Sequence, residues 1–422
     1  QNLRERAPLI NLKAKPSDSP ETEFVGAGNF FFGFDTRHGP LLPALVDPAL
    51  VFGEGMDFAR PHAFLGAEPF DAGAIQARHC LTPCAFLFWR LRLPGRGVRR
   101  LVSVYGCAPS LGAARQAARK ILAPGYLERK AGENRLEIGR VMHRAFLHCG
   151  SEELNQYLPR TFLDNVLRGG LPVTLPAGRR RFVFHVYSRR HGDLERDYNF
   201  FQLAPTFFSQ GNGAFRDVNQ NRRCDVWFNP DVQAENLRLF FNLIQPDGYN
   251  PLLCRGARFQ VTDRRGLAEL LRRAVAPDGR QPVQDFLARP FAPGELFRFL
   301  SEEGLQTRLP QEKFLDEVLS LCEKREDADY EAGYWTDHWY HCLDHLESFL
   351  AIFPDRLREI LVGRSEFTFY DPVMRVVPRD ERYVLRRPGE VRQLDPLAPD
   401  PDKIKLLAAR RAIESADPKK AE

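Results

Sequence analysis

The pattern of apolar residues changes near residue 193, and this change constrains the fold more than any other feature of the sequence. Up to about residue 106, apolar and aromatic residues form short runs such as GNFFFGFD, FLFWRLRL and LVSVYGC, bounded by Gly and Pro. Such runs are typical of β-strands. After residue 193, helical patterns alternate with long polar loops. The order predicts an α+β chain in which a β domain precedes a helical domain.

The intervening segment carries local signals for two helices and a strand pair. Residues 110–122 begin with a capping Ser and predict one helix. Residues 136–167 predict helix with a break near Cys149–Gly150, and strands are expected over 171–175 and 182–187. Further helices are expected over 231–243, 266–275, 294–303, 311–323, 338–352 and from 404 onward. Successive helices with polar loops fit an α/α toroid.

Composition excludes several classes of protein. The 422 residues are 43% hydrophobic, with a net charge of +5, which is too mild to indicate a nucleic-acid partner. A run of eighteen apolar residues does not occur, so no membrane-spanning helix is expected. The eight Cys are scattered without a CxxC, which favours reduced thiols in the cytoplasm. A zinc site at His79, Cys80 and Cys84 has no second pair of ligands to complete it.

The chain begins with QNLRERAPLINLK, which lacks an initiating Met and the layout of a secretory signal. The simplest interpretation is that it starts inside a longer gene product. Arg179–Arg181 and Arg189–Arg190 flank an apolar run. They are interpreted as a solvated strand end or, alternatively, as a contact for phosphate.

A polar cluster spans residues 209–225, SQGNGAFRDVNQNRRCD, and is expected to form a loop. It combines two Gly, the Arg216–Asp217 pair and several amides. Forked and bidentate hydrogen-bonding groups suit a ligand covered with hydroxyls. The alternative is a polar loop braced by its own salt bridge.

A second cluster, YEAGYWTDHWYHCLDHLE, spans residues 330–347. Asp337 lies between Trp335 and Trp339 where a helix should begin, so it could be a helix cap. Alternatively, apolar neighbours could keep its carboxyl group protonated as a proton donor. His341 and His345 have the i, i+4 spacing of a metal pair, but the Glu that zinc peptidases carry after the first His is missing. No metal site is therefore predicted.

Five blocks together resemble a known family: residues 157–170, 191–223, 242–252, 333–339 (GYWTDHW) and 391–395. They are similar to 1,2-β-oligoglucan phosphorylases, which belong with the cellobiose and chitobiose phosphorylases. The resemblance extends from about residue 25 to about residue 400. The chain departs from the family at Ala214 and Ala332, where Asn and Glu are typical. It departs again in YHCLDHLE after Trp339, where a run like TYNLDLIE is typical.

The resemblance implies a domain layout. Residues 1–108 would form part of a β-sandwich-like domain, residues 109–190 a helical linker with a strand pair, and residues 191–422 the first part of an (α/α)6 barrel. The family's barrel extends beyond the residues present here and includes much of the phosphate site. The resemblance therefore implies a fragment that is inactive on its own.

The resemblance also implies roles for particular residues. Phe215–Arg216–Asp217 matches the family motif that grips the reacting sugar, and Asp337 in GYWTDHW matches the general acid. Other expected sugar-binding residues are Gln220, Asn221, Tyr334, Trp335 and His338.

The implied reaction is reversible phosphorolysis of β-1,2-linked glucooligosaccharides to α-glucose 1-phosphate with inversion. Its expected partners are an oligosaccharide and inorganic phosphate as co-substrate, without a metal or organic cofactor, and a homodimer is left open. Two alternatives remain: a β-glucan hydrolase or transglycosylase on the same barrel, and a non-catalytic glucan-binding fragment.

Overall fold

The computed structural model describes most of the chain, in two compact units that divide at residue 137. Each unit is described by itself. The described residues are 8–10, 28–37, 41–55, 57–66, 70–76, 83–188, 206–251, 253–329, 336–363, 367–370 and 372–416.

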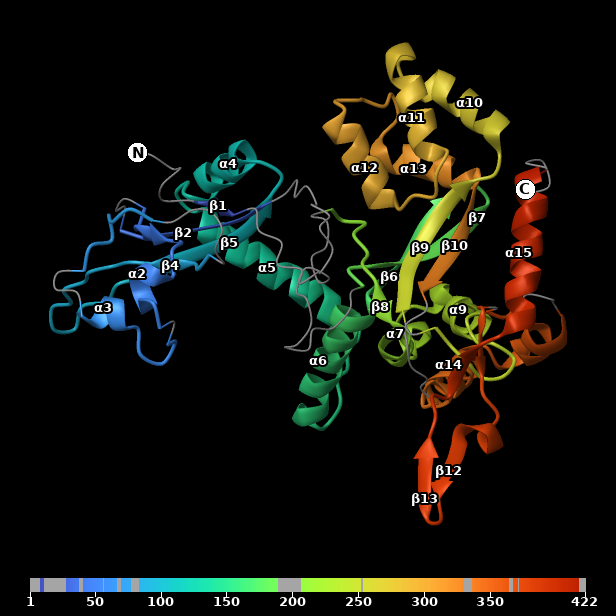
Figure 1. The fold of residues 1–422 in the computed structure, drawn as a ribbon. Coiled ribbons are helices and arrows are strands. Elements are labelled where there is room, and N and C mark those ends of the chain that lie inside the picture. Colours follow the sequence, from blue (N-terminus) through green and yellow to red (C-terminus); the bar gives the residue numbers. More distant parts are fainter. Residues whose placement is uncertain are drawn as a thin grey trace. The chain divides into compact units, whose positions relative to one another are not determined.

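The first unit is built on an antiparallel sheet in the order β1 (Leu9–Ile10), β2 (Gly28–Asp35), β5 (Leu101–Ala108). Phe30, Phe32 and Phe34 of β2 recur at every second position and therefore share one face of the sheet. This face packs on Ala114 and Ala118 of α4 (Leu111–Ile121), the helix drawn beside the sheet in Figure 1. The Ser110 side chain caps α4 by accepting from the Ala113 N–H at 3.2 Å, which confirms the predicted helix.

A smaller cluster in the first unit joins β3 (Ala44–Leu45) and β4 (Phe86–Leu87), with α2 (Ala49–Phe52) and α3 (His62–Gly66) nearby in the chain. The predicted strand FLFWRLRL is therefore strand only at its first two residues. Its partner β3 is only two residues long, and beyond it Phe88 still donates from its backbone N–H to the Pro43 carbonyl at 3.0 Å. α5 (Tyr126–His143) crosses the unit boundary and buries no residue.

In the second unit, the end of α5 is followed by α6 (Glu152–Gly169) and by the hairpin of β6 (Leu171–Ala177) and β7 (Arg180–Val186). Ser151 caps α6 through the Leu154 N–H, which confirms the predicted break near Cys149–Gly150. The predicted strand pair is confirmed as well.

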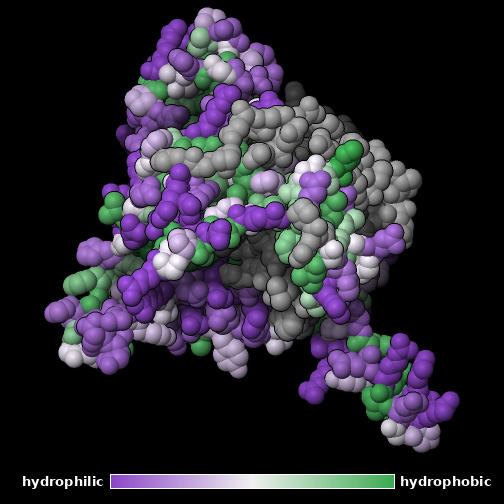
Figure 2. Space-filling model, turned by 90° about the vertical axis from the view of Figure 1, so that its left-hand side faces the viewer, coloured by the Kyte–Doolittle hydropathy of each residue, from purple (hydrophilic) through white to green (hydrophobic). Residues whose placement is uncertain are grey.

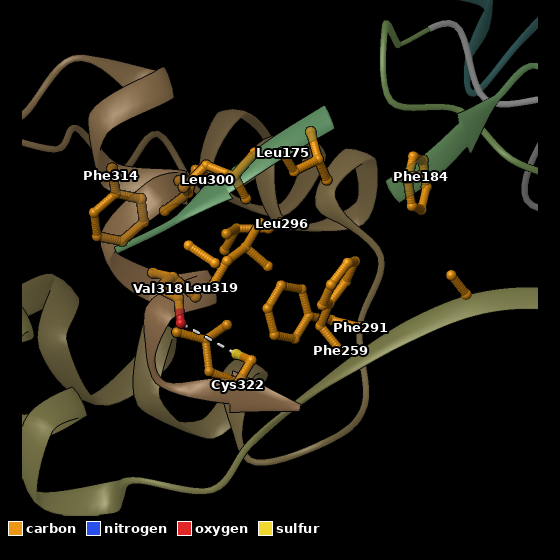
Figure 3. Close-up of a cluster of buried hydrophobic side chains, with 14 of the residues drawn as sticks. Leu175, Phe184, Phe259, Phe291, Leu296, Leu300, Phe314, Val318, Leu319 and Cys322 are labelled. Carbon is orange, nitrogen blue, oxygen red and sulfur yellow. Dashed lines mark hydrogen bonds between the residues drawn. The ribbon is translucent and has the colours of Figure 1, made fainter. Parts of the chain in front are cut away.

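The main sheet of this unit has the order β10 (Cys322–Asp329), β9 (Leu253–Val261), β8 (Gly213–Ala214), all antiparallel. Between β9 and β10 the chain forms four helices: α10 (Arg264–Ala274), α11 (Arg280–Leu287), α12 (Pro293–Glu302) and α13 (Gln311–Ser320). Their apolar faces meet the sheet in one core, where Phe259, Phe291 and Leu296 are buried together (Figure 3).

Two expected helices are present but shorter than predicted. The helix expected over 311–323 is confirmed from Gln311 to Ser320, but Cys322 already pairs with Val261 as the first residue of β10. The helix expected over 231–243 is a 3-10 turn at Pro230–Val232 followed by α9 (Glu235–Asn242), because Gln233 adopts a φ of 47° that interrupts the helix.

The remaining elements complete the second unit. α7 (Phe215–Arg222), α8 (Asp225–Phe228) and α14 (His338–Ile352) lie near the sheet. A π-helical turn at Glu359–Gly363 is followed by the pair β11 (Met374–Val376) and β14 (Leu397–Pro399). The hairpin β12 (Tyr383–Arg387) and β13 (Glu390–Gln393) projects from the unit, and α15 (Pro401–Ala416) is the last helix (Figure 1).

The structure thus combines helices with several small sheets, consistent with the α+β class, and over the described ranges the helices close no barrel. Within those ranges, no helix is both long enough and apolar enough to cross a bilayer. The side of the molecule seen in Figure 2 is largely hydrophilic where it is coloured, with apolar residues in small scattered groups.

Candidate functional site

The polar cluster expected as a loop is a short strand followed by a helix. Gly213–Ala214 forms β8 and pairs with β9, and α7 begins directly afterwards. The loop expectation was wrong because the pairing of Gly213 with Cys254 fixes the start of the segment through a distant part of the chain.

Helical periodicity divides α7 into two faces. The buried face carries Phe215, Val218, Asn219 and Arg222. The opposite face carries Arg216, Asp217, Gln220 and Asn221, the four α7 residues expected to bind sugar.

The buried face of α7 anchors the helix. Phe215 and Val218 pack in a core with Phe240 of α9 and Cys342 of α14. The buried Arg222 donates from Nε to the Gly169 carbonyl at 2.7 Å and from Nη2 to the Ser188 hydroxyl at 3.1 Å. These contacts tie both ends of α7 to the protein interior, while Arg216 and Gln220 stay exposed on the opposite face.

Asp337 stands at the N-cap position of α14, but its side chain makes no capping hydrogen bond. Its Oδ2 instead accepts from Nε of Arg216 on α7. Its Oδ1 is buried, and no described residue donates to it. The carboxylate therefore faces α7 rather than the backbone of its own helix, which removes the helix cap as the role of this side chain.

Arg216 lies between two carboxylates. Besides Asp337, its Nη1 is 3.9 Å from Oδ1 of Asp217, beyond hydrogen-bond distance. The side chains of Arg216, Asp217 and Asp337 are 45%, 35% and 37% exposed. A guanidinium and two carboxylates at a partly open surface form a set of forked donors and acceptors that matches a polyhydroxylated ligand.

The other expected site residues occupy different environments. Gln220 is exposed on the same face of α7 as Arg216. The Asn221 amide donates to the Asp217 carbonyl at 2.7 Å, so this donor serves the helix itself. His338 is fully buried against the Phe215 ring, with 5.8 Å between ring centroids. Tyr334 and Trp335 lie outside the described residues.

The three His of α14 lie in different environments. His338 and His345 are buried, whereas His341 lies at the partly exposed edge that carries Asp337 and Asp344. Burial and the nearby Arg223 lower the pKa of His341. Among the described residues, no group of three or more His, Cys, Asp or Glu is arranged to hold a metal ion. Of the residues considered for zinc, His79 and Cys80 fall outside the described part of the chain.

A buried polar network lies beneath α7, and only the tertiary structure reveals it. Oδ2 of Asp225 is 2.9 Å from Nε2 of His185 and accepts from the Asn236 amide at 2.9 Å. The same amide donates to the carbonyl of Arg222 at 3.2 Å. Burial raises the pKa of Asp225 to about 7 and lowers that of His185. Asp225 ends the polar cluster in the sequence, but no local signal identified His185 as its partner.

The basic cluster at the start of β7 has structural partners. Arg180 donates to the carbonyls of Ser320 and Cys322 at 3.1 and 2.9 Å, and Arg181 is 3.8 Å from Asp231 at an exposed position. Arg180 and Arg181 also line a cavity of about 570 Å³ with Lys324, whose charge is paired with Glu235 and Glu326. The lining of this cavity includes both cations and carboxylates, and none of the expected sugar-binding residues lines it. Arg189 and Arg190 are outside the described residues.

No family model matches the chain, and no curated protein matches it.

Proposed function

We propose that this chain belongs to an inverting glycoside phosphorylase that acts on β-1,2-linked glucooligosaccharides, with Asp337 as the general acid. One observation carries the proposal. Arg216 and Asp337 are 121 residues apart in the sequence, yet their side chains are in contact. They belong to two separate blocks of the family resemblance. For the reaction to occur, the residues that bind the sugar and the acid that protonates the leaving oxygen must meet at the same glycosidic bond.

The reaction assigns a role to each group. Arg216 and Asp217 would bind hydroxyls of the glucose whose anomeric carbon reacts. Asp337 would transfer its proton to the glycosidic oxygen as the bond from this oxygen to C1 breaks, while a phosphate oxygen bonds to C1 from the opposite face. The products are α-glucose 1-phosphate and a glucan one unit shorter. An inverting hydrolase needs a second carboxylate to activate water, whereas phosphate is itself the nucleophile.

The contact between Arg216 and Asp337 sets one requirement on this mechanism. A neighbouring guanidinium favours the ionised form of a carboxyl group, and that form has no proton to donate. Sugar hydroxyls would therefore have to draw Arg216 away from Asp337 before the transfer, and Asp217 offers the guanidinium a neighbouring acceptor.

The proposal extends to the architecture and the setting. Residues 191–422 would be the first part of an (α/α)6 barrel, with α7 and α14 among its helices, preceded by the β-sandwich-like and linker regions. The partners would be an oligosaccharide and inorganic phosphate in the cytoplasm, and no metal or organic cofactor takes part.

The test measures release of glucose 1-phosphate from β-1,2-glucooligosaccharides by the full-length gene product, with and without phosphate. The Asp337→Asn variant should lose most of the phosphorolysis, because a general acid supplies a factor of roughly 10²–10⁴ in rate. Its oligosaccharide affinity should stay within a few-fold of the wild type. A variant that retains more than about a tenth of the rate would exclude Asp337 as the acid. Sugar release that needs no phosphate would instead indicate a hydrolase.

A further inference from the structure

α7 and α14 are joined by two ion pairs at the same offset in sequence. Arg216 contacts Asp337, and Arg223, just after α7, lies 3.3 Å from Asp344. Both pairs span 121 residues. An equal offset means that the two segments run parallel and advance together, since each α-helical residue rises about 1.5 Å. The ion pair at the candidate site is thus one of two ion pairs in a longer contact between the two helices.

Buried contacts between the same two helices accompany the ion pairs. Asn219, on the buried face of α7, donates from Nδ2 to the Cys342 sulfur at 3.3 Å. The backbone carbonyl of Asn219 accepts from Nε2 of His345 at 3.1 Å, and both side chains are buried. This carbonyl lies in the C-terminal half of α7, and a backbone carbonyl has two lone pairs with which to accept hydrogen bonds. The hydrogen bond from His345 therefore links α14 directly to the backbone of α7.

The chemistry of His345 suits a permanent contact. A carbonyl oxygen can only accept, so Nε2 must carry the hydrogen in this contact. Burial lowers the pKa of His345 to about 3, which keeps the ring neutral at physiological pH. The ring also stacks on Phe240 of α9, with 4.9 Å between centroids. Its position is thus fixed by both packing and hydrogen bonding.

We infer that His345 is a positioning residue: its hydrogen bond to the Asn219 carbonyl holds α7 in register with α14 and thereby places Arg216 opposite Asp337. The inference rests on the proposed function in so far as Arg216 and Asp337 are the clamp and the acid. Exposed ion pairs contribute little to stability because solvent screens them. The two partly exposed ion pairs are therefore poor candidates for setting the register, whereas the buried contact of His345 is protected from water.

The test compares two substitutions at His345. His345→Leu removes the donor at similar volume, whereas the amide of His345→Gln can still donate to the Asn219 carbonyl. The leucine variant should lose at least about tenfold in kcat with KM within about threefold, since misplacing catalytic groups by an ångström is costly. The glutamine variant should recover to within about threefold of the wild type.

A matched control separates positioning from lost stability. Leu315→Ala in α13 opens a cavity in the core under the main sheet, away from α7 and α14. It should lower the melting temperature while kcat of the folded protein stays near the wild-type value. Wild-type kcat in His345→Leu would overturn the inference. So would an equal loss of kcat in Leu315→Ala, or a failure of His345→Gln to restore turnover.

A second readout does not depend on catalysis. Unfolding free energies of Arg216→Gln, Asp337→Asn and the double variant report whether the two side chains are coupled. The effects should be non-additive in the wild-type and His345→Gln backgrounds, and additive in His345→Leu. Coupling that persists in His345→Leu would overturn the inference. Absence of phosphorolysis in the wild type would reject the proposed function and leave this measurement to decide the register.

Discussion

At the scale of single residues, substitution of Asp217 tests whether the Arg216–Asp217 pair binds sugar or only stabilises the local structure through its salt bridge. Its carboxylate is 3.9 Å from Arg216 and about a third exposed, so the attraction should add little to stability. We expect Asp217→Ala to abolish turnover, because hydrogen bonds to sugar hydroxyls are lost, while the melting temperature changes by only a few degrees at most. Activity assays and calorimetry on the same samples check both halves. A large fall in melting temperature with turnover retained would identify a brace.

Asp225 should make stability depend on pH. Burial raises its pKa from 3.8 to about 7, so the folded protein holds this proton more tightly than the unfolded chain. A raised pKa contributes stability that is complete below about pH 4 and is lost as the pH rises to about 7. In the Asp225→Asn variant this loss is absent. The unfolding free energy of the variant minus that of the wild type should therefore increase across this window, by at most about 1.4 kcal/mol per pH unit.

Urea unfolding at several pH values between 4 and 8 measures this difference. Comparing variant with wild type cancels the contribution of groups that titrate alike in both. A difference that is constant with pH would show that Asp225 is ionised in the folded protein throughout the range.

At the scale of elements, Gly170 links α6 to β6 in a backbone conformation that other residues rarely adopt, with φ of 92°. An added Cβ would lie 2.9 Å from Cβ of Ser188 and 3.0 Å from Cβ of His185. We expect Gly170→Ala to lower the free energy of unfolding by about 1–3 kcal/mol. Gly139→Ala is the matched control: it lies within α5 with open space around it, so alanine should stabilise by about 0.5–1 kcal/mol. Equal effects at the two sites would contradict this account.

The elements that the sequence predicted correctly carry their signals locally. Ser110 and the residues after it encode α4, and the residues around Gly150 encode the break before α6. β9 and β10 escaped prediction because each is stabilised by a partner about 60 residues away. β10, which begins CEKRED, has the composition of an exposed segment rather than of a buried strand. α7 was missed for a related reason, since its polar residues looked like a loop until the sheet and α14 buried one side.

At the scale of the whole molecule, the two units have separate cores. Phe32 belongs to the core beneath β2 and α4 in the first unit, and Leu315 to the core of the second. Domains with their own cores can unfold independently. We expect calorimetry to resolve two transitions. Phe32→Leu should lower one and Leu315→Ala the other. A single transition that both variants shift equally would show that the units unfold together.

The sequence by itself determined the α+β class, most helix positions and the hairpin β6–β7, because capping residues and apolar periodicity act over a few residues. It also singled out Arg216 and Asp337, through motifs rather than geometry. Only the tertiary structure decided that these two side chains meet, that His338 lies in the core, and that His185 and His345 are hydrogen-bonded beneath α7. These outcomes depend on contacts between residues far apart in the chain. Such contacts form when whole elements pack together, and local sequence patterns do not predict them.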